Sequence, residues 1–190
     1  MKLLRAAAAA AIASWCVAVQ TSASPTKFGF QSPVSFAGTG CRDTEAVVDW
    51  INNSSDLRVR FDRYSTSRQA RVSCRFVIPI EVAPGYQISQ LIVDWVDYVE
   101  GTGQLKRKFS FAGKSLQSWR TSHFNKPKGD DFTVRDYLRN DAFSISCGGQ
   151  HHIGVRSELR AKGEKNFIAL DNMDFAQHNG IIFKAKYKKC

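Results

Sequence analysis

After its N-terminal segment, the sequence lacks any apolar run long enough to cross a bilayer. The one apolar run, at residues 6–19, is shorter than the ~20 residues that a membrane-spanning helix needs. The basic residues Lys2 and Arg5 precede this run, and small residues ending at Ala23 follow it, which is the pattern of a secretory signal peptide. We expect cleavage after Ala23 to leave residues 24–190 as one domain that is secreted or otherwise extracytoplasmic.

The sequence also lacks the closely spaced cysteines that zinc sites require. Cys16 falls within the expected signal peptide. A lipoprotein anchor there is the alternative, but bulky Trp15 stands where a small residue precedes the cut. The mature chain then keeps four distant cysteines: Cys41, Cys74, Cys147 and Cys190. An even number of distant cysteines in a secreted chain indicates disulfides, and the sequence leaves all three pairings open.

Helical periodicity is nearly absent. Instead, short runs of alternating apolar and polar residues are separated by Gly, Pro, Asn and Asp. We predict strands at residues 34–37, 46–51, 57–62, 71–82, 87–99, 105–111, 131–136, 142–146, 151–160, 167–175 and 181–187. This density of short strands predicts an all-β fold, a single antiparallel β-sandwich stapled by disulfides.

Two long predicted strands, 71–82 and 87–99, are separated by an Ala-Pro-Gly-Tyr sequence at 83–86 that favours a turn. We predict that they pair as a central hairpin. Pro79 has no backbone N–H, so its strand is expected at a sheet edge or at a bulge. The polar residues 115–130 are predicted to form an extended loop.

No nucleophile motif, phosphate-binding loop or metal-ligand spacing stands out in the sequence. The segment from Cys147 to His152 gathers a thiol and two imidazoles, His151 and His152. Adjacent strand residues face opposite sides, however, and a secreted cysteine is usually oxidised. The two glycines in this segment are better explained by a turn or a bulge. We expect no catalytic residue, metal or cofactor.

Acidic residues also occur in pairs, which could serve a glycosidase or bind calcium. The pairs are Asp94 with Asp97, Asp130 with Asp131, and Asp171 with Asp174. Odd spacing on a regular strand places the members of the first and last pairs on opposite faces. We expect these carboxylates to be solvated in turns and on strand faces.

The mature chain is clearly basic. Without Lys2 and Arg5, 25 of the 27 basic residues remain against 17 acidic ones, a formal charge of +8. Such a charge attracts anionic partners, and it also simply keeps a protein in solution. Alternation along the strands predicts a basic face made of Arg58, Arg60, Lys106, Lys108, Lys184, Lys186 and Lys188. Arg156 and Arg160 are candidates to extend it.

Two explanations of the last three lysines remain open, because charge alone supports both. They could bind an anionic ligand, or they could protect an exposed strand edge against aggregation. Four aromatic residues would offer surfaces for stacking on sugars or bases if exposed, and would be ordinary core if buried: Trp95, Trp119, Tyr98 and Phe124.

Several short motifs follow one another along the mature chain. They are Gly38-Thr39-Gly40-Cys41, the strand from Leu57 to Tyr64, Ser73-Cys74, Pro84-Gly85-Tyr86-Gln87, Cys147-Gly148-Gly149 and a terminal Cys190. In this order they resemble the domain of unknown function 4360 family. Its members are small secreted proteins with a G-S-G-C start, a strand ending in F-D-x-Y, a central Cys, a P-x-G-F/Y-Q turn, a late C-G and a C-terminal Cys. The resemblance implies a compact secreted β domain without an established activity.

The resemblance also bears on the disulfides. Many members of that family have a further cysteine in the region that here spans residues 113–128, where this sequence has none. If that cysteine normally joins the equivalent of Cys147, then Cys147 must pair with Cys41 or stay free. The resemblance therefore favours Cys41 with Cys147 and Cys74 with Cys190.

These observations predict a non-catalytic binding module for an anionic or carbohydrate surface polymer, or for a partner protein. It would bind through the basic face and the loop at 115–130. A small extracytoplasmic hydrolase is one alternative, recognised by a concave pocket that holds a carboxylate near its partner group. A structural or coat component is another, recognised by an exposed apolar patch. Nucleic acid is disfavoured as a partner, because no recognised binding module is visible.

Overall fold

The computed structural model describes residues 27–51, 55–139, 147–170 and 180–190. Several expectations lie wholly or partly outside these residues. They are the signal peptide at 1–23, the strand at 142–146, the end of the strand at 167–175, and the pair Asp171 and Asp174.

The described chain is a 12-stranded antiparallel sheet, which confirms the predicted all-β class. A short 3-10 helix, η1 (Asp43–Glu45), precedes β3. The strands are β1 (Phe28–Phe30), β2 (Ser35–Gly38), β3 (Ala46–Ile51), β4 (Asp56–Phe61), β5 (Ser65–Ser67), β6 (Arg71–Val82), β7 (Tyr86–Phe111), β8 (Lys114–Ser115), β9 (Arg120–Arg139), β10 (Gly149–Ala161), β11 (Phe167–Ala169) and β12 (Gly180–Lys189).

Most of the predicted strands are present. β3 and β6 have the predicted boundaries, and β2, β4, β10 and β12 differ from them by one or two residues at each end. The strands predicted at 87–99 and 105–111 are parts of one strand, β7, which continues through Gly101 and Gly103.

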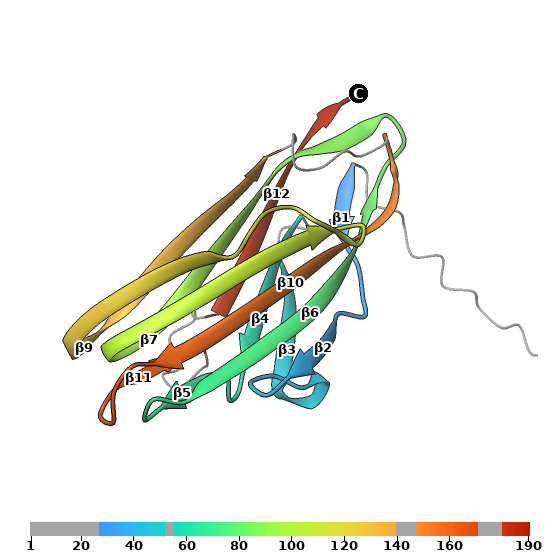
Figure 1. The fold of residues 1–190 in the computed structure, drawn as a ribbon. Coiled ribbons are helices and arrows are strands. Elements are labelled where there is room, and N and C mark those ends of the chain that lie inside the picture. The colour runs from blue at the N-terminus through green and yellow to red at the C-terminus, as the bar shows by residue number, and fades with distance from the viewer. Residues whose placement is uncertain (1–26, 52–54, 140–146, 171–179) are drawn as a thin grey trace, which may run out of the picture.

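The single sheet is folded into two layers because β7 and β9 double back together (Figure 1). The first half of β7, up to Val96, pairs with β12, and the second half, from Gly103 onward, pairs with β10. β9 follows β7 along both halves, with a register shift between Val99 and Gly101. The first layer contains β1, β2, β6, β10, the second half of β7 and the first half of β9. The second layer contains β3, β4, β12 and the remaining halves of β7 and β9.

The predicted central hairpin is wrong, although its turn exists. The Tyr86 N–H donates to the Ala83 carbonyl at 3.1 Å, and Gly85 has φ +81°. β10 lies between β6 and β7 in the strand order, and β7 begins in the second layer. The turn therefore joins the two layers. Alternation in the sequence identifies the buried face of a strand, but it does not identify the neighbouring strand.

Pro79 lies on β6, within the first layer. On the edge of β6 that faces β1 and β2, strand pairing is interrupted beside this proline. Its carbonyl accepts the Gln31 N–H at 2.8 Å. The N–H and carbonyl of one strand residue point to the same edge, so the missing donor also faces this edge. The interruption lies between β1, which ends at Phe30, and β2, which begins at Ser35. β6 is flanked on both sides, and the proline removes no bond that β10 needs.

The extended loop predicted at residues 115–130 is also wrong. From Arg120 onward these residues belong to β9, in register with β7. β9 pairs with β7 alone among the described strands, and many of its side chains are exposed. The strand predicted at 131–136 is part of β9, but its polar first half has no apolar alternation from which a strand could be predicted. One aromatic pair does hold the two halves of β9 together, since Phe124 stacks on Phe132 with ring centroids 4.4 Å apart.

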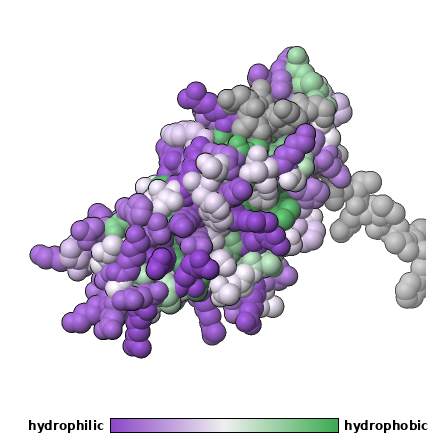
Figure 2. Space-filling model, in the orientation of Figure 1, coloured by the Kyte–Doolittle hydropathy of each residue, from purple (hydrophilic) through white to green (hydrophobic). Residues whose placement is uncertain are grey.

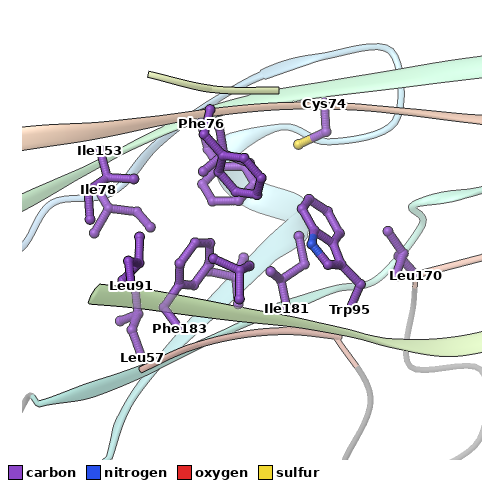
Figure 3. Close-up of a cluster of buried hydrophobic side chains, with 14 of the residues drawn as sticks. Leu57, Cys74, Phe76, Ile78, Leu91, Trp95, Ile153, Leu170, Ile181 and Phe183 are labelled. Carbon is purple, nitrogen blue, oxygen red and sulfur yellow. The ribbon is translucent and has the colours of Figure 1, made fainter. Parts of the chain in front are cut away.

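The hydrophobic core lies between the two layers, and aromatic rings from both layers meet there (Figure 3). Phe76 of β6 packs edge-on against Phe183 of β12, with ring centroids 5.9 Å apart. Trp95 packs against Phe109 from the other half of the same strand, at 6.2 Å. These contacts fix the separation of the layers, and they leave one face of each layer directed outward.

A buried charged cluster joins the two halves of β7 and of β9 across the core. The Asp136 carboxylate accepts hydrogen bonds from Trp95 Nε1 at 3.0 Å, Arg107 Nε at 2.7 Å and Arg120 Nη1 at 3.0 Å. The side chains of Arg107 and Asp136 are only 4 % and 3 % exposed. Arg120 and Asp136 belong to the same strand, so their contact requires β9 to fold back on itself.

All four predicted cysteines form disulfides, but the pairing favoured by the family resemblance is wrong. Cys41 is bonded to Cys74, and Cys147 is bonded to Cys190, with Cα separations of 5.4 and 6.1 Å. The first bond is buried beside β6. The second is exposed and ties the chain's end to the loop before β10.

The buried cluster predicts a large effect of removing its carboxylate. Asp136→Ala leaves the Arg107 charge buried without its partner, so the free energy of unfolding should fall by about 3–5 kcal/mol. Replacing both residues by apolar side chains, as in Arg107→Met with Asp136→Leu, should recover at least half of that loss. Urea unfolding of the three proteins measures this, and equal losses in the single and double variants would contradict it.

The two disulfides should differ in their sensitivity to reductant. Thiol–disulfide exchange requires access to a sulfur atom, and only the Cys147–Cys190 bond is exposed. Under native conditions, a mild reductant followed by alkylation should label Cys147 and Cys190 first. Peptide mass spectrometry identifies the labelled residues, and early labelling of Cys41 or Cys74 would show that this order is wrong.

Candidate functional site

The structure divides the predicted basic face between two opposite sides of the molecule. Lys106 and Lys108 lie on the outer face of the first layer, on the second half of β7. The other predicted residues lie on the outer face of the second layer: Arg58 and Arg60 on β4, and Lys184, Lys186 and Lys188 on the neighbouring β12. The outer faces of the two layers point in opposite directions and cannot form one binding surface. The two groups of basic residues are therefore separate candidate sites.

Several cations of the second layer already have acidic neighbours. Arg60 Nε lies 2.7 Å from Asp49. Asp94 contacts Arg135 Nε at 2.5 Å and Lys184 Nζ at 3.5 Å. Much of the positive charge on this face is therefore compensated within the protein.

The expectation that Asp94 and Asp97 are solvated is wrong, because they are 4 % and 2 % exposed. They do face opposite sides of β7. Asp94 is on the outer side, where Arg135 and Lys184 cover it. Burial alone would raise the pKa of Asp94, but the hydrogen bonds and charges of these two cations outweigh burial and lower its pKa below the usual range. Asp130 and Asp131 are exposed, as expected.

The cysteine and histidine segment does not assemble a nucleophile. Cys147 is held in a disulfide. His151 is half-buried, with Nε2 3.2 Å from the Gly148 carbonyl and its ring 5.3 Å from that of Phe111. His152, its neighbour on β10, is exposed. Among the described residues, no group of three or more His, Cys, Asp or Glu side chains gathers as a metal site would require.

Of the four aromatic residues considered for stacking, Trp119 is the exposed one. Trp119 is 46 % exposed and lies just before β9. Trp95 is fully buried in the core, and Tyr98 and Phe124 are half-buried. Trp119 therefore remains as a surface on which a flat ring could stack.

Trp119 lines one of two open cavities on the outer face of the first layer, which have volumes of about 430 and 420 Å³. The first is hollow because its lining includes Gly113, Gly154 and Ser110. The second is lined by Trp119, together with Arg71, Ser73 and Glu158. Both cavities share Ala37, Arg75 and Arg156, so they adjoin across these residues. In the view of Figure 2, the described surface is mainly hydrophilic, with only small hydrophobic areas.

Three cations lie side by side across the strands, and two of them, Arg75 and Arg156, line both cavities. Arg75 of β6 is directly opposite Arg156 of β10, which is directly opposite Lys108 of β7. We call these three residues the first cationic row. Like charges at opposing positions destabilise a sheet. Within the described part of the chain, none of the three forms an ion pair with an acidic residue, so the row lacks the compensation present on the second layer.

Sequence reasoning found this row only in part. Lys108 was placed in the basic face and Arg156 was a candidate to extend it, but Arg75 was missed. Arg71, Ser73 and Arg75 alternate with buried residues along β6, which shows that they share an outward face. That they face Arg156 and Lys108 depends on the cross-strand register, which a single sequence does not give.

The two cavities contain one carboxylate among their described lining residues, that of Glu158. It lies 3.5 Å from Arg71 Nη1, and its side chain is 17 % exposed. Glycosidases of the usual kind need a pair of carboxylates across the bond they cleave. This arrangement offers charge and stacking for binding, and it does not supply that pair.

The fold and the site together define an all-β domain with an open cationic surface on one sheet face. The chain belongs to the family described as "Domain of unknown function (DUF4360)", whose model matches residues 32–190. No curated protein matches the chain significantly. No helix in the described ranges is long and apolar enough to cross a membrane.

Solved structures similar to the chain at low identity include the following three. TmCBM61 in complex with β-1,4-galactotriose is 12 % identical, with 84 % of this chain and 90 % of that chain covered and a TM-score of 0.33. A GH31 α-xylosidase from Xanthomonas citri is also 12 % identical, covering 86 % of this chain and 17 % of that chain, with a TM-score of 0.31. The enzymatically active domain of bacteriophage CBA120 tailspike protein 4 is 11 % identical, covering 87 % and 20 %, with a TM-score of 0.26. At such scores the likeness carries no argument about function.

The ion pairs of Asp94 with Arg135 and Lys184 predict that the stability of the protein depends on pH. Because the folded protein lowers the pKa of Asp94, its ionised form contributes stability above the unfolded value of about 3.9, and this contribution is lost as pH falls through the folded pKa. Asp94→Asn should lower the free energy of unfolding at pH 7 and reduce its decline below about pH 4. Urea unfolding across this range measures both effects. Asp131→Asn, which alters an exposed carboxylate, should retain the wild-type decline, and a loss of slope there too would contradict the assignment.

Proposed function

We propose that this chain is a non-catalytic binding module for an acidic polysaccharide outside the cytoplasm, and that the outer face of the first layer binds it. The observation that carries the proposal is the first cationic row, Arg75, Arg156 and Lys108. Its two arginines line two adjoining open cavities, and the exposed Trp119 lines one of these.

The chemistry of these side chains suits charged sugars. The planar guanidinium of arginine matches a carboxylate or sulfate group with two parallel hydrogen bonds. The face of an indole ring offers a large, rigid apolar surface against which a sugar ring packs, while the sugar hydroxyls stay exposed to polar groups. Small residues such as Gly154 and Ala37 keep the face open for a chain to lie across the strands.

The energetics of the row support the same reading. Three adjacent cations, none of which forms an ion pair with a described acidic residue, cost stability in the unbound protein. A bound anion removes this repulsion, so the free energy of binding includes the relief of an unfavourable interaction. On the second layer, Asp49 and Asp94 already neutralise nearby cations, so an anion gains less there.

Location supports such a ligand. Both disulfides are consistent with an oxidising compartment, and we propose that residues 1–23 direct the chain there.

The test is binding of the chain without residues 1–23 to a panel of acidic and neutral polysaccharides. Replacing Arg75, Arg156 and Lys108 together by Gln should weaken binding to acidic members by about two orders of magnitude and reduce its salt dependence. Trp119→Ala should weaken binding at least about tenfold. Isothermal titration calorimetry at two salt concentrations measures both.

The competing candidate site, the three lysines on the outer face of β12, is tested in the same experiment. The variant Lys184→Gln, Lys186→Gln and Lys188→Gln removes the same amount of charge from the opposite face. If this variant loses binding while the first-row variant keeps it, the site is on the second layer and our proposal is wrong. Absence of binding by the wild-type domain to every acidic polysaccharide would also overturn it.

A further inference from the structure

The outer face of the first layer carries its charges in bands that run across β6, β10 and β7. The first cationic row holds Arg75, Arg156 and Lys108. The next row, two residues along each strand, holds Ser73, Glu158 and Lys106. The row after that holds Arg71, Arg160 and Gln104, and we call it the second cationic row. The formal charge of the three rows, in this order along the strands, is therefore +3, 0 and +2.

The spacing of these bands follows from strand geometry. Arg75 and Arg71 are four residues apart on β6, which corresponds to about 13 Å along an antiparallel strand. Between them, Glu158 presents the only negative charge of the three rows. An anionic polymer lying along the strands thus meets cations, then a carboxylate, then cations again.

From this banding we propose that Glu158 is a specificity-determining residue. It selects an acidic polysaccharide whose charges are separated by uncharged sugar, and it rejects polymers with charge on every unit, such as single-stranded nucleic acid. This inference rests on the proposed function, because it concerns the ligand of the same surface.

The surroundings of Glu158 explain how a neutral sugar is accommodated. Its cavity is also lined by Trp119 and by Ser73, its direct cross-strand neighbour. A ring that packs on Trp119 brings its hydroxyl groups towards a carboxylate that accepts hydrogen bonds and a serine that accepts or donates them. The acidic groups on either side of that ring then reach the two cationic rows.

The same geometry disfavours a uniformly charged chain. A single strand of DNA in its helical form carries a phosphate about every 3.4 Å, so any segment that spans both cationic rows places phosphates beside Glu158. Glu158 is largely buried and held by Arg71 at 3.5 Å, so it does not simply swing away into solvent. Each phosphate near it meets a like charge, which repels it.

The experiment compares Glu158→Gln with Glu81→Gln. Both remove one negative charge from β6 or its partner β10. Glu81, opposite Gln150, lies well beyond the first cationic row, on the side away from Glu158. Binding is measured by fluorescence anisotropy or calorimetry to hyaluronan, with one carboxylate per disaccharide, and to dextran sulfate and single-stranded oligothymidylate, which are densely charged.

Glu158→Gln should raise the affinity for the two densely charged polymers about three- to tenfold, and should leave hyaluronan binding unchanged or weaker. Glu81→Gln should change none of them by more than about twofold. An equal gain in both variants would show that net charge alone matters and would overturn the inference, as would an unchanged preference in Glu158→Gln. Urea unfolding verifies that both variants are folded.

This outcome is separable from that of the proposed function. If the wild-type domain binds no acidic polysaccharide, yet Glu158→Gln alone gains affinity for the densely charged polymers, then the rejection by Glu158 stands and the polysaccharide ligand does not. If the wild-type domain binds hyaluronan and Glu158→Gln behaves like Glu81→Gln, the ligand class stands and the role of Glu158 does not.

Discussion

The bend shared by β7 and β9 is the constraint on which the rest of this structure depends. One continuous sheet becomes a two-layered sandwich only because these strands turn back and face themselves. The Asp136 carboxylate holds the turned halves together through Arg107, Arg120 and the Trp95 indole. An apolar contact would resist separation as well, but a buried charge with three directed partners also fixes the offset between the layers. Such a cluster contributes less to stability than to the choice of one arrangement, since its desolvation offsets much of its attraction.

Because the bend sets the offset, it also sets which residues face outward together. The outer face of the first layer brings β6, β10 and the end of β7 into one register, and Arg75, Arg156 and Lys108 become neighbours although they are far apart in the chain. The outer face of the second layer has a different balance, with Asp49 and Asp94 placed among its cations. Two faces of the same basic protein thus differ in how much of their charge is available to a ligand. The total charge of the sequence does not distinguish them.

The sequence predicted what depends on local pattern and missed what depends on register. The predicted boundaries of β6 are correct because buried residues alternate with more exposed ones along most of this strand. Those of β3 are also correct, although none of its residues is buried. The four cysteines were recognised as disulfide-bonded, but their partners depend on which strands are close in space. The sequence predicts a strand at 131–136, which lies in β9, but it predicts a loop for the earlier part of β9 because an edge strand that is polar on most positions carries no apolar period. Asp94 was expected in solvent because the sequence does not show that Arg135 and Lys184 cover it. For the candidate site, Lys108, Arg156 and Trp119 were named individually, whereas Arg75 and the row they form required the structure.

The position of β12 has a consequence for the order in which the molecule can be assembled. β12 follows the other described strands in the chain, yet it is an interior strand, lying between β4 and β7 in the second layer. Until residues 180–190 are available, β4 and the first half of β7 have no partner between them, and the second layer stays open. Pairings between distant segments also form slowly, because the chain must lose much of its conformational freedom before they are made. A chain that lacks β12 therefore cannot complete the second layer.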